Sequence, residues 1–289
     1  TSYIMILIDY NAIAIGNIIT QRLDIDENLI RHMILNSIRM YRKRFKKEYG
    51  EVVIVADGWQ NWRKEVYPQY KASRRKNRDA SSLDWNEIFR IINDVREDIK
   101  ENFPYKVVHV GECEADDAIA HIAYNTQEFG QYEPVMIISA DKDFAQLQTM
   151  SNVKQYSPMT KKFIVEENPR LQLMNLILSG DGSDGVPNVL SDDDCFVEGR
   201  RQTPLTKKKK EAIMVDLEDG ELLYAASWYR NYCRNKQLID LKETPKPVVE
   251  KIINTFKEQD PCDNKGKVFP YFVDKRMKNL LESIEEFIS

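Results

Sequence analysis

The chain has 289 residues, of which 42% are hydrophobic and 30% are charged, a globular composition with room for one large domain or two small ones. The net charge of −4 argues weakly against a nucleic-acid partner, although the distribution of charge matters more than its sum. No segment approaches the roughly 20 apolar residues of a membrane helix, and the apolar run before Asp9 is too short for a signal peptide. We therefore expect a cytoplasmic protein with no membrane partner.

The cysteines and histidines indicate neither a disulfide framework nor a zinc site. The four cysteines lie far apart and form no CxxC pair: Cys113, Cys195, Cys233 and Cys262. We interpret them as free thiols in a reducing compartment. The three histidines lack the HxxH or HExxH spacing of zinc ligands and are interpreted as structural or surface residues.

The first two-thirds of the chain alternates short apolar runs with amphipathic segments. The apolar runs predict strands at residues 3–9, 52–57, 106–110 and 135–140, and a fifth at 153–156. Amphipathic spacing predicts helices at residues 27–49, 83–102 and 114–129. Strand–helix alternation of this kind predicts an α/β fold with a mainly parallel sheet and helices on both faces.

The last third has a different pattern. An apolar helix at residues 171–179 ends at Gly180, and further helices are expected near residues 204–215, 221–234, 245–257 and 274–288. No convincing strand follows residue 180. We therefore expect an α/β domain at residues 1–180 and a smaller, mostly helical region at residues 181–289.

Acidic residues stand where the predicted strands end. Asp9 and Asp57 close the first two strands, and Asp141 and Asp143 follow the fourth. The carboxyl ends of parallel strands meet at one edge of an open sheet, so these side chains are expected to share a site. If the chain stays extended, Asp141 and Asp143 point the same way. A helix cap or a turn explains one such acid well, but explains acids at three strand ends poorly.

Three more acids, Glu114, Asp116 and Asp117, open the helix after the third strand. The helix dipole alone favours acids there, but three exceed what a cap needs. In a continuous helix Glu114 and Asp116 would diverge by about 200°. They converge on one ion only if Glu114 lies just before the helix begins, and Asp117 is then a capping residue or a support for the ligands.

A glycine-rich loop at residues 180–185 carries Asp181 and Asp184. It lacks the ligand spacing of an EF-hand and is either a flexible loop or a donor of metal carboxylates. The candidate metal ligands in the predicted cleft are then Asp9, Asp57, Glu114, Asp116, Asp141, Asp143, Asp181 and Asp184. Such crowded carboxylates stay ionised only beside cations, and oxygen ligands indicate two Mg²⁺, with Mn²⁺ as a substitute. Two ions about 4 Å apart can clamp the attacking and leaving oxygens of a phosphoryl displacement.

A basic segment at residues 59–78 begins two residues after Asp57. It holds seven Lys or Arg residues against one acid, and its aromatic residues are Trp59, Trp62, Tyr67 and Tyr70. Cations that bind phosphates and rings that stack on bases are typical of single-strand nucleic-acid binding, although a solvated basic loop has a similar composition. The position of the segment favours an arm over the metal site, where Lys71 or Arg74 can neutralise the scissile phosphate.

A second basic patch, at Arg200, Arg201 and residues 207–210, lies in the helical region. It is as consistent with a contact to a duplex backbone as with a solvated face. The candidate nucleic-acid-binding residues of the two patches are Arg63, Lys64, Tyr67, Tyr70, Lys71, Arg74, Arg75, Lys76, Arg78, Arg200, Lys207 and Lys208.

Seven motifs, in their order and spacing, resemble the 5′-nuclease or flap endonuclease family over nearly the whole chain. They are LID at 7–9, VAD at 55–57, YKASR at 70–74, GECEADD at 111–117, ISADKDFAQL at 138–147, QYSPM at 155–159 and SGDGSDGV at 179–186. Each motif is weak alone, and together they are highly specific. The likeness is closest to the branch of the family that T-even bacteriophages encode.

The resemblance implies a PIN-like α/β fold: a mainly parallel twisted sheet flanked by helices, with a helical arch at about residues 59–82. It implies that residues 181–289 bind duplex DNA. The implied activity is that of a structure-specific 5′-to-3′ exonuclease and flap endonuclease. Such an enzyme hydrolyses RNA–DNA and DNA duplexes, leaves 5′-phosphates, and removes RNA primers and 5′ flaps during replication.

The resemblance also divides the carboxylates between two ions. The group around the first ion is Asp9, Asp57, Glu114 and Asp116, and Asp116 lies between the two ions. The group around the second ion is Asp141, Asp143, Asp181 and Asp184. Tyr70, Lys71 and Arg74 match arch residues that engage the scissile phosphate. The implied catalytic residues are Lys71, Arg74, Asp116 and Asp141.

The chain departs from the family after the glycine-rich loop. Residues 185–210 lack the glycine pair of the helix-two-turn-helix with which cellular members bind duplex DNA, so the geometry of that contact and any K⁺ site are left open. The implied protein is a monomer, in the host cytoplasm if phage-encoded, whose partners are DNA and RNA–DNA hybrids with 5′ ends or flaps. A single-stranded-DNA-binding protein and a sliding clamp are further candidate partners, although no clear clamp-binding motif ends the chain.

Three functions are to be separated. The first is the structure-specific 5′-nuclease. The second is a PIN-like ribonuclease for single-stranded RNA, which would need neither the basic arm nor the helical duplex-binding region. The third is a non-catalytic DNA-binding scaffold, which predicts missing metal ligands, and none of the candidate carboxylates is missing.

Overall fold

The computed structural model describes residues 4–20, 25–127 and 132–289. The chain forms two compact units, each assembled from separate segments. Unit 1 consists of Thr1–Trp59, Asp84–Val165 and Lys246–Ser289, and unit 2 of Gln60–Leu83 and Glu166–Pro245. Among the described residues, no helix is both long enough and apolar enough to cross a membrane.

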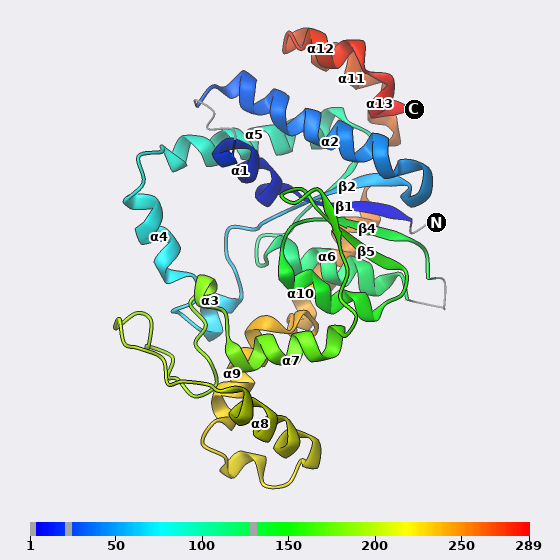
Figure 1. The fold of residues 1–289 in the computed structure, drawn as a ribbon. Helices are drawn as coiled ribbons and strands as arrows, with labels where there is room; N and C mark the ends of the chain where they lie inside the picture. The colour runs from blue at the N-terminus through cyan, green and yellow to red at the C-terminus, as the bar shows by residue number, and fades with distance from the viewer. Residues whose placement is uncertain (1–3, 21–24, 128–131) are drawn as a thin grey trace. The chain divides into compact units, whose positions relative to one another are not determined.

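A six-stranded sheet forms the centre of unit 1 (Figure 1). Its strands, in the order β3-β2-β1-β4-β5-β6, are β3 (Lys106–His109), β2 (Glu51–Ala56), β1 (Met5–Asp9), β4 (Val135–Ile138), β5 (Val153–Ser157) and β6 (Lys162–Ile164). Neighbouring strands are parallel except for β5 and β6. The predicted mainly parallel sheet is confirmed, and β6 is an addition that the sequence analysis missed.

Helices cover both faces of this sheet, which explains why β1 is buried along its whole length. On one face lie α1 (Tyr10–Thr20), α2 (Glu27–Tyr49) and α5 (Trp85–Asn102), and on the other α6 (Ala115–Asn125) and α10 (Lys246–Glu258) (Figure 1). The other described elements of unit 1 are η2 (Lys142–Thr149), η6 (Pro261–Lys267), α11 (Val268–Asp274), α12 (Lys278–Glu282) and α13 (Glu285–Ile288).

The predicted helix at residues 27–49 has the bounds of α2. The side chain of Asp26 caps its first turn by accepting from Leu29 N at 2.7 Å, and Gly50, with φ 76°, ends it. Other predictions differ from the structure. Helix α1 was not expected, and the helix expected at 114–129 is α6, which ends at Asn125, while residues 128–131 lie outside the described residues.

Unit 2 is helical in its described elements. These are α3 (Arg63–Val66), α4 (Ala72–Asp79), α7 (Pro169–Ser179), η3 (Gly182–Asp184), α8 (Lys207–Asp219), η4 (Leu223–Ala225), α9 (Tyr229–Ile239) and η5 (Leu241–Glu243). One core cluster joins the basic segment to α7 and α9: Tyr67, Tyr70, Ile177, Val186, Leu238 and Ile239. A helix that was expected at residues 221–234 begins only at Tyr229.

The compact units do not follow the boundary expected at residues 180 and 181. Residues 246–289 belong to the unit of the sheet, because α10 packs on α6 and β3. Lys106 Nζ donates to Phe256 O at 2.7 Å, and the Gln259 side chain bonds both the N–H and the carbonyl of Val107. An amphipathic helix pattern shows that a face is buried, but it does not tell which element buries it.

Candidate active site

Asp9 and Asp57 stand at the carboxyl ends of neighbouring parallel strands, as predicted. Asp9 is the last residue of β1 and is buried, and Asp57 directly follows β2. Asp57 Oδ1 accepts from Ala115 N at 2.8 Å, and its own N–H donates to Asn11 Oδ1 at 3.0 Å. These bonds hold Asp57 against the first turns of α1 and α6. The role of Asn11 was missed because α1 was not expected.

The start of α6 meets the condition set for Glu114. Glu114 is the N-cap, with extended angles of φ −80° and ψ 162°, so it lies just before the helix. Its N–H donates to Asp117 Oδ2 at 3.2 Å. Asp117 is fully buried and caps the helix in a reciprocal capping box with Glu114. Because Glu114 lies outside α6, the roughly 200° between the side chains of Glu114 and Asp116 in a continuous helix does not apply here.

The segment after β4 does not stay extended, which corrects one expectation. Asp141 caps the short helix η2, and its Oδ1 accepts from Asp143 N at 2.9 Å. The chain turns because this aspartate bonds the backbone two residues ahead, as Asp does at turns. Gln155 on β5 stabilises this turn, because its Nε2 donates to Ser139 O at 2.9 Å and to Asp141 O at 2.7 Å.

Three carboxylates of unit 1 converge despite that turn. Asp116, Asp141 and Asp143, all half-buried, offer oxygen atoms within 4.8 Å of one another. They come from the first turn of α6 and from the start of η2. Hard oxygen donors without imidazole or thiolate fit Mg²⁺ or Mn²⁺, and the mutual repulsion of the three charges favours a bound cation. The donor set therefore fits a divalent metal ion.

Ser139 connects this cluster to Asp9. Its Oγ donates to Asp9 Oδ2 at 2.8 Å and accepts from Asp141 N at 3.1 Å. Ser139 and Gln155 are each 1% exposed, so water does not replace these bonds. Neither Ser139 nor Gln155 was predicted from the sequence. The only sequence signal for Ser139 was its position two residues before Asp141, from which a serine hydroxyl can bond the backbone of the acidic segment.

In unit 2, the glycine-rich loop is folded on itself. Asp181 caps η3, where its Oδ1 accepts from Ser183 N at 3.0 Å and from Ser183 Oγ at 2.5 Å. Gly185 has φ 74°, and a Cβ there would lie 3.1 Å from Gln69 O. This left-handed position next to another backbone explains why glycine ends the loop.

The same loop binds the basic segment through Asp184. Lys71 N donates to Asp184 O at 2.7 Å, and Arg74 Nη2 lies 2.7 Å from Asp184 Oδ1. Lys71 Nζ lies 3.8 Å from the same oxygen. Lys71 itself is left-handed, with φ 55°, a strained conformation for a residue with a Cβ. Two predicted phosphate-binding cations are thus anchored to a predicted metal carboxylate within one unit.

Three residues predicted to contact nucleic acid are buried instead. Arg63 is 2% exposed, and its Nε donates to Leu238 O at 2.8 Å. The Tyr67 hydroxyl lies 3.0 Å from Gly185 O and 2.7 Å from Asp193 O, and burial raises the pKa of Tyr67 to about 12, so it remains protonated. Tyr70 packs in the same core cluster. These side chains support the arm and are unavailable to a base, which corrects the prediction.

The other predicted cations reach solvent. Within the basic segment Lys64, Arg74, Arg75 and Lys76 are exposed and Arg78 is half-buried. In the second patch Arg200 forms an ion pair with Asp194, and Lys207 and Lys208 are exposed in the first turn of α8. Cations at a helix N-terminus oppose the helix dipole, so this placement does not serve the stability of α8.

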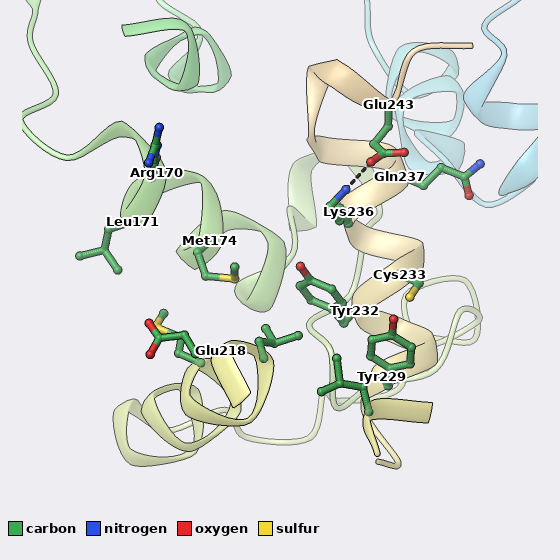
Figure 2. Close-up of a pocket in the computed structure, with 13 residues that line it drawn as sticks. Arg170, Leu171, Met174, Glu218, Tyr229, Tyr232, Cys233, Lys236, Gln237 and Glu243 are labelled. Atoms are coloured by element: carbon green, nitrogen blue, oxygen red, sulfur yellow. Dashed lines mark hydrogen bonds and ion pairs between the residues drawn. The ribbon is translucent and has the colours of Figure 1, made fainter. Parts of the chain in front are cut away.

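A pocket of about 850 Å³ lies between α7, α8 and α9 of unit 2 (Figure 2). Met174 and Tyr232 are among its lining residues, as is Lys236, which is paired with Glu243. None of the residues that line this pocket belongs to the predicted site, and the convergent carboxylates are found elsewhere.

Comparison with known proteins decides the family. Residues 5–172 match the model of the 5′-3′ exonuclease N-terminal resolvase-like domain, and residues 167–287 match the model of the T4 RNase H C-terminal region. The chain belongs to the 5′-3′ exonuclease family. Ribonuclease H of Enterobacteria phage T4 is 34% identical over 97% of this chain and 95% of its own. The predicted likeness to the T-even phage branch is confirmed.

Other proteins are similar to part of the chain or to its fold. The flap endonuclease Xni of Shewanella denitrificans is 28% identical over 57% of this chain and 64% of its own. The T5 5′-exonuclease with bound divalent metal ions (zinc) superimposes with a TM-score of 0.61 at 18% identity, covering 88% of this chain and 98% of its own. That likeness confirms the predicted fold class.

Proposed function

We propose that this protein is a structure-specific 5′-nuclease that removes RNA primers and 5′ flaps by hydrolysing phosphodiesters of RNA–DNA and DNA duplexes. The observation that carries the proposal is the convergence of Asp116, Asp141 and Asp143 at the carboxyl ends of the parallel strands. A site of this kind in a member of the 5′-3′ exonuclease family fits phosphodiester hydrolysis.

The carboxylates of unit 1 would hold the proposed Mg²⁺ ions. Asp116, Asp141 and Asp143 form the core of the set, and Asp9, Asp57 and Glu114 flank it on the ends of β1, β2 and the start of α6. Asp181 and Asp184 of unit 2 are proposed as further ligands of a second ion. When bound, a metal pair would supply positive charge that stabilises the negative charge of the transition state.

The cations of the arm would act on the scissile phosphate. Lys71 and Arg74 are paired with Asp184 in unit 2, and a phosphate oxygen can replace the carboxylate oxygen as their partner. Water attacks phosphorus, the bond to the 3′ oxygen of the preceding nucleotide breaks, and that oxygen takes a proton. The products are a 5′-phosphate and a 3′-hydroxyl.

The exposed cations would bind the phosphate backbone of the substrate. Lys64, Arg75 and Lys76 of the arm reach solvent, as do Lys207 and Lys208 at the start of α8. Phosphate contacts fix orientation without reading sequence, which suits an enzyme that selects a DNA shape. The proposed partners are DNA and RNA–DNA hybrids with 5′ ends or flaps, bound by a monomer.

One comparison of substrates tests the proposal. The protein is incubated with a 5′-flap, a nicked duplex, an RNA–DNA hybrid and free single-stranded RNA, in Mg²⁺ and in EDTA. We expect the flap, the nicked duplex and the RNA–DNA hybrid to be cleaved in Mg²⁺ but not in EDTA, with 5′-phosphate products. A strong preference for free RNA would establish the single-strand ribonuclease instead, and no cleavage of any substrate in Mg²⁺ or Mn²⁺ would favour the non-catalytic scaffold.

A further inference from the structure

Residues 59–78 hold four aromatic side chains, and the structure, which describes them all, leaves one of them available to a ligand. Trp62, Tyr67 and Tyr70 are at most 5% exposed, whereas Trp59 is 78% exposed. A stacking role for the aromatic residues of this segment can therefore fall only on Trp59. Single exposed apolar residues are common on protein surfaces, so the surroundings of the ring matter.

The indole of Trp59 is seated rather than loose. It lies over Gly111, where a Cβ would come within 2.5 Å of the Trp59 ring. The ring of His109, at the end of β3, packs edge-to-face against it at 5.3 Å between centroids. Part of one face of the indole thus contacts Gly111 and its ring meets His109, while most of the ring surface faces solvent. A preorganised aromatic surface binds a planar ligand at a lower entropic cost than a mobile one.

The ring also belongs to the loops that carry the carboxylates. Trp59 stands two residues after Asp57. Gly58 N donates to Cys113 O at 2.8 Å, and a Cβ on Gly58 would lie 2.2 Å from Val110 O. The loop after β2 is therefore joined to the loop that leads into Glu114. A ligand stacked on Trp59 would therefore lie at the same carboxyl-terminal edge of the sheet as the carboxylates.

We propose that Trp59 is a stacking platform for an unpaired nucleobase adjacent to the scissile phosphate. The inference rests on the proposed function and adds to it a binding site for one base. Stacking on an aromatic ring tolerates every base, because each has a π-face. It favours a nucleotide that has left the duplex, such as the first base of a flap or of a frayed end.

Stacking is tested by combining a substitution of Trp59 with the removal of one base from the flap substrate. Flap substrates carry either a normal or an abasic nucleotide at each of the two positions that flank the cleavage site. Binding is measured by fluorescence anisotropy in the Asp141→Asn background, where we expect no cleavage, and KM and kcat are measured in proteins that keep Asp141. We expect Trp59→Ala to weaken binding of the normal flap about tenfold and Trp59→Phe to restore most of it. With the abasic nucleotide at one position, the three proteins should bind equally.

Two controls separate stacking from a structural role. Phe269→Ala removes an aromatic side chain of α11 that is 56% exposed. Helix α11 follows η6, whose Asn264 side chain donates to Phe103 O just before β3. This control residue therefore lies toward the amino-terminal side of β3. It should leave flap binding unchanged. Binding of Mn²⁺ without DNA should be the same in Trp59→Ala as in the unaltered protein, since only a structural role disturbs Glu114.

The outcomes that overturn the inference are distinct from failure of the proposed function. Unchanged flap binding by Trp59→Ala, a tenfold loss that persists at both abasic positions, or a loss of Mn²⁺ affinity would each refute stacking. The cleavage assay on the unaltered protein stands apart from these results, because the 5′-nuclease is refuted only there, by absence of flap cleavage or by a strong preference for free RNA.

Discussion

Ser139 joins Asp9, at the end of β1, to the acidic segment that follows β4. Its Oγ donates to Asp9 Oδ2 at 2.8 Å and accepts from Asp141 N at 3.1 Å. One side chain, 1% exposed, thereby fixes the orientation of one carboxylate and the backbone of another. Groups that orient metal ligands commonly matter nearly as much as the ligands.

Ser139→Ala should therefore weaken Mn²⁺ binding on the order of 10- to 100-fold, while the protein still folds. Titration of the metal without DNA measures the affinity, and the metal concentration for half-maximal cleavage should rise in parallel. Ser139→Thr keeps the hydroxyl and should restore most of the affinity. Equal metal affinity for the alanine and threonine variants would show that the hydrogen bond to Asp9 does not position a ligand.

Asp141→Asn should abolish cleavage while flap binding remains within a few-fold of the unaltered protein. The substitution removes one negative charge from the cluster of Asp116, Asp141 and Asp143 but keeps the shape and the cap of η2. Single-turnover cleavage and anisotropy measure the two effects. Lys142 is exposed beside it, so Lys142→Gln is a neighbouring control that should cut normally. Substantial cleavage by Asp141→Asn would exclude the residue as a metal ligand.

Lys71→Ala should slow the single-turnover rate by on the order of 10²-fold, because a cation at the scissile phosphate acts mainly in the transition state. Lys64→Ala removes an exposed lysine from α3 of the same arm and should change that rate little. An unaltered single-turnover rate in Lys71→Ala would rule out the assigned role, whatever its effect on binding.

Arg75→Ala and Lys76→Ala should each weaken DNA binding without lowering the rate at which bound DNA is cleaved. Both residues are exposed on α4, so each can contribute one phosphate contact. Each loss should lower the slope of log K against log salt by about 0.7 to 0.9. Titrations of a flap at several KCl concentrations measure the slope, and a weakening that is independent of salt would contradict a phosphate contact.

The stability of unit 2 should depend on the ionisation of Asp193. Burial opposes its charge, but hydrogen bonds from Arg230 and Arg234, at 2.6 to 2.8 Å, lower its pKa below the ordinary value. A lowered pKa in the folded state stabilises the protein above the pKa of the unfolded chain, about 3.9. That contribution is lost as the pH falls through the folded value.

Asp193→Asn should accordingly lower the urea midpoint at pH 7, and the difference from the unaltered protein should shrink as the pH falls below about 4. Asp192→Asn makes the same change of charge at an exposed neighbour and should have a small effect at both pH values. A difference for Asp193→Asn that is the same at pH 7 and pH 3 would contradict an ionic contribution.

The sequence by itself determined the alternation of strands and helices, the carboxylates at the strand ends and the family. These follow from local pattern: buried parallel strands read as continuous apolar runs, and five of the six strands of the sheet were expected. The position of Glu114 before α6 was stated as a condition, and the cap geometry met it.

Only the tertiary structure decided which side chains are available. Tyr67, Tyr70 and Arg63 have the composition of a nucleic-acid contact but pack against α7, α9 and the glycine-rich loop, whereas Trp59 remains exposed. The links of Ser139 to Asp9 and of Lys71 to Asp184 join residues far apart in the chain. Periodicity reports that a residue is buried, but the partner that buries it, or that accepts its hydrogen bond, is set by long-range packing.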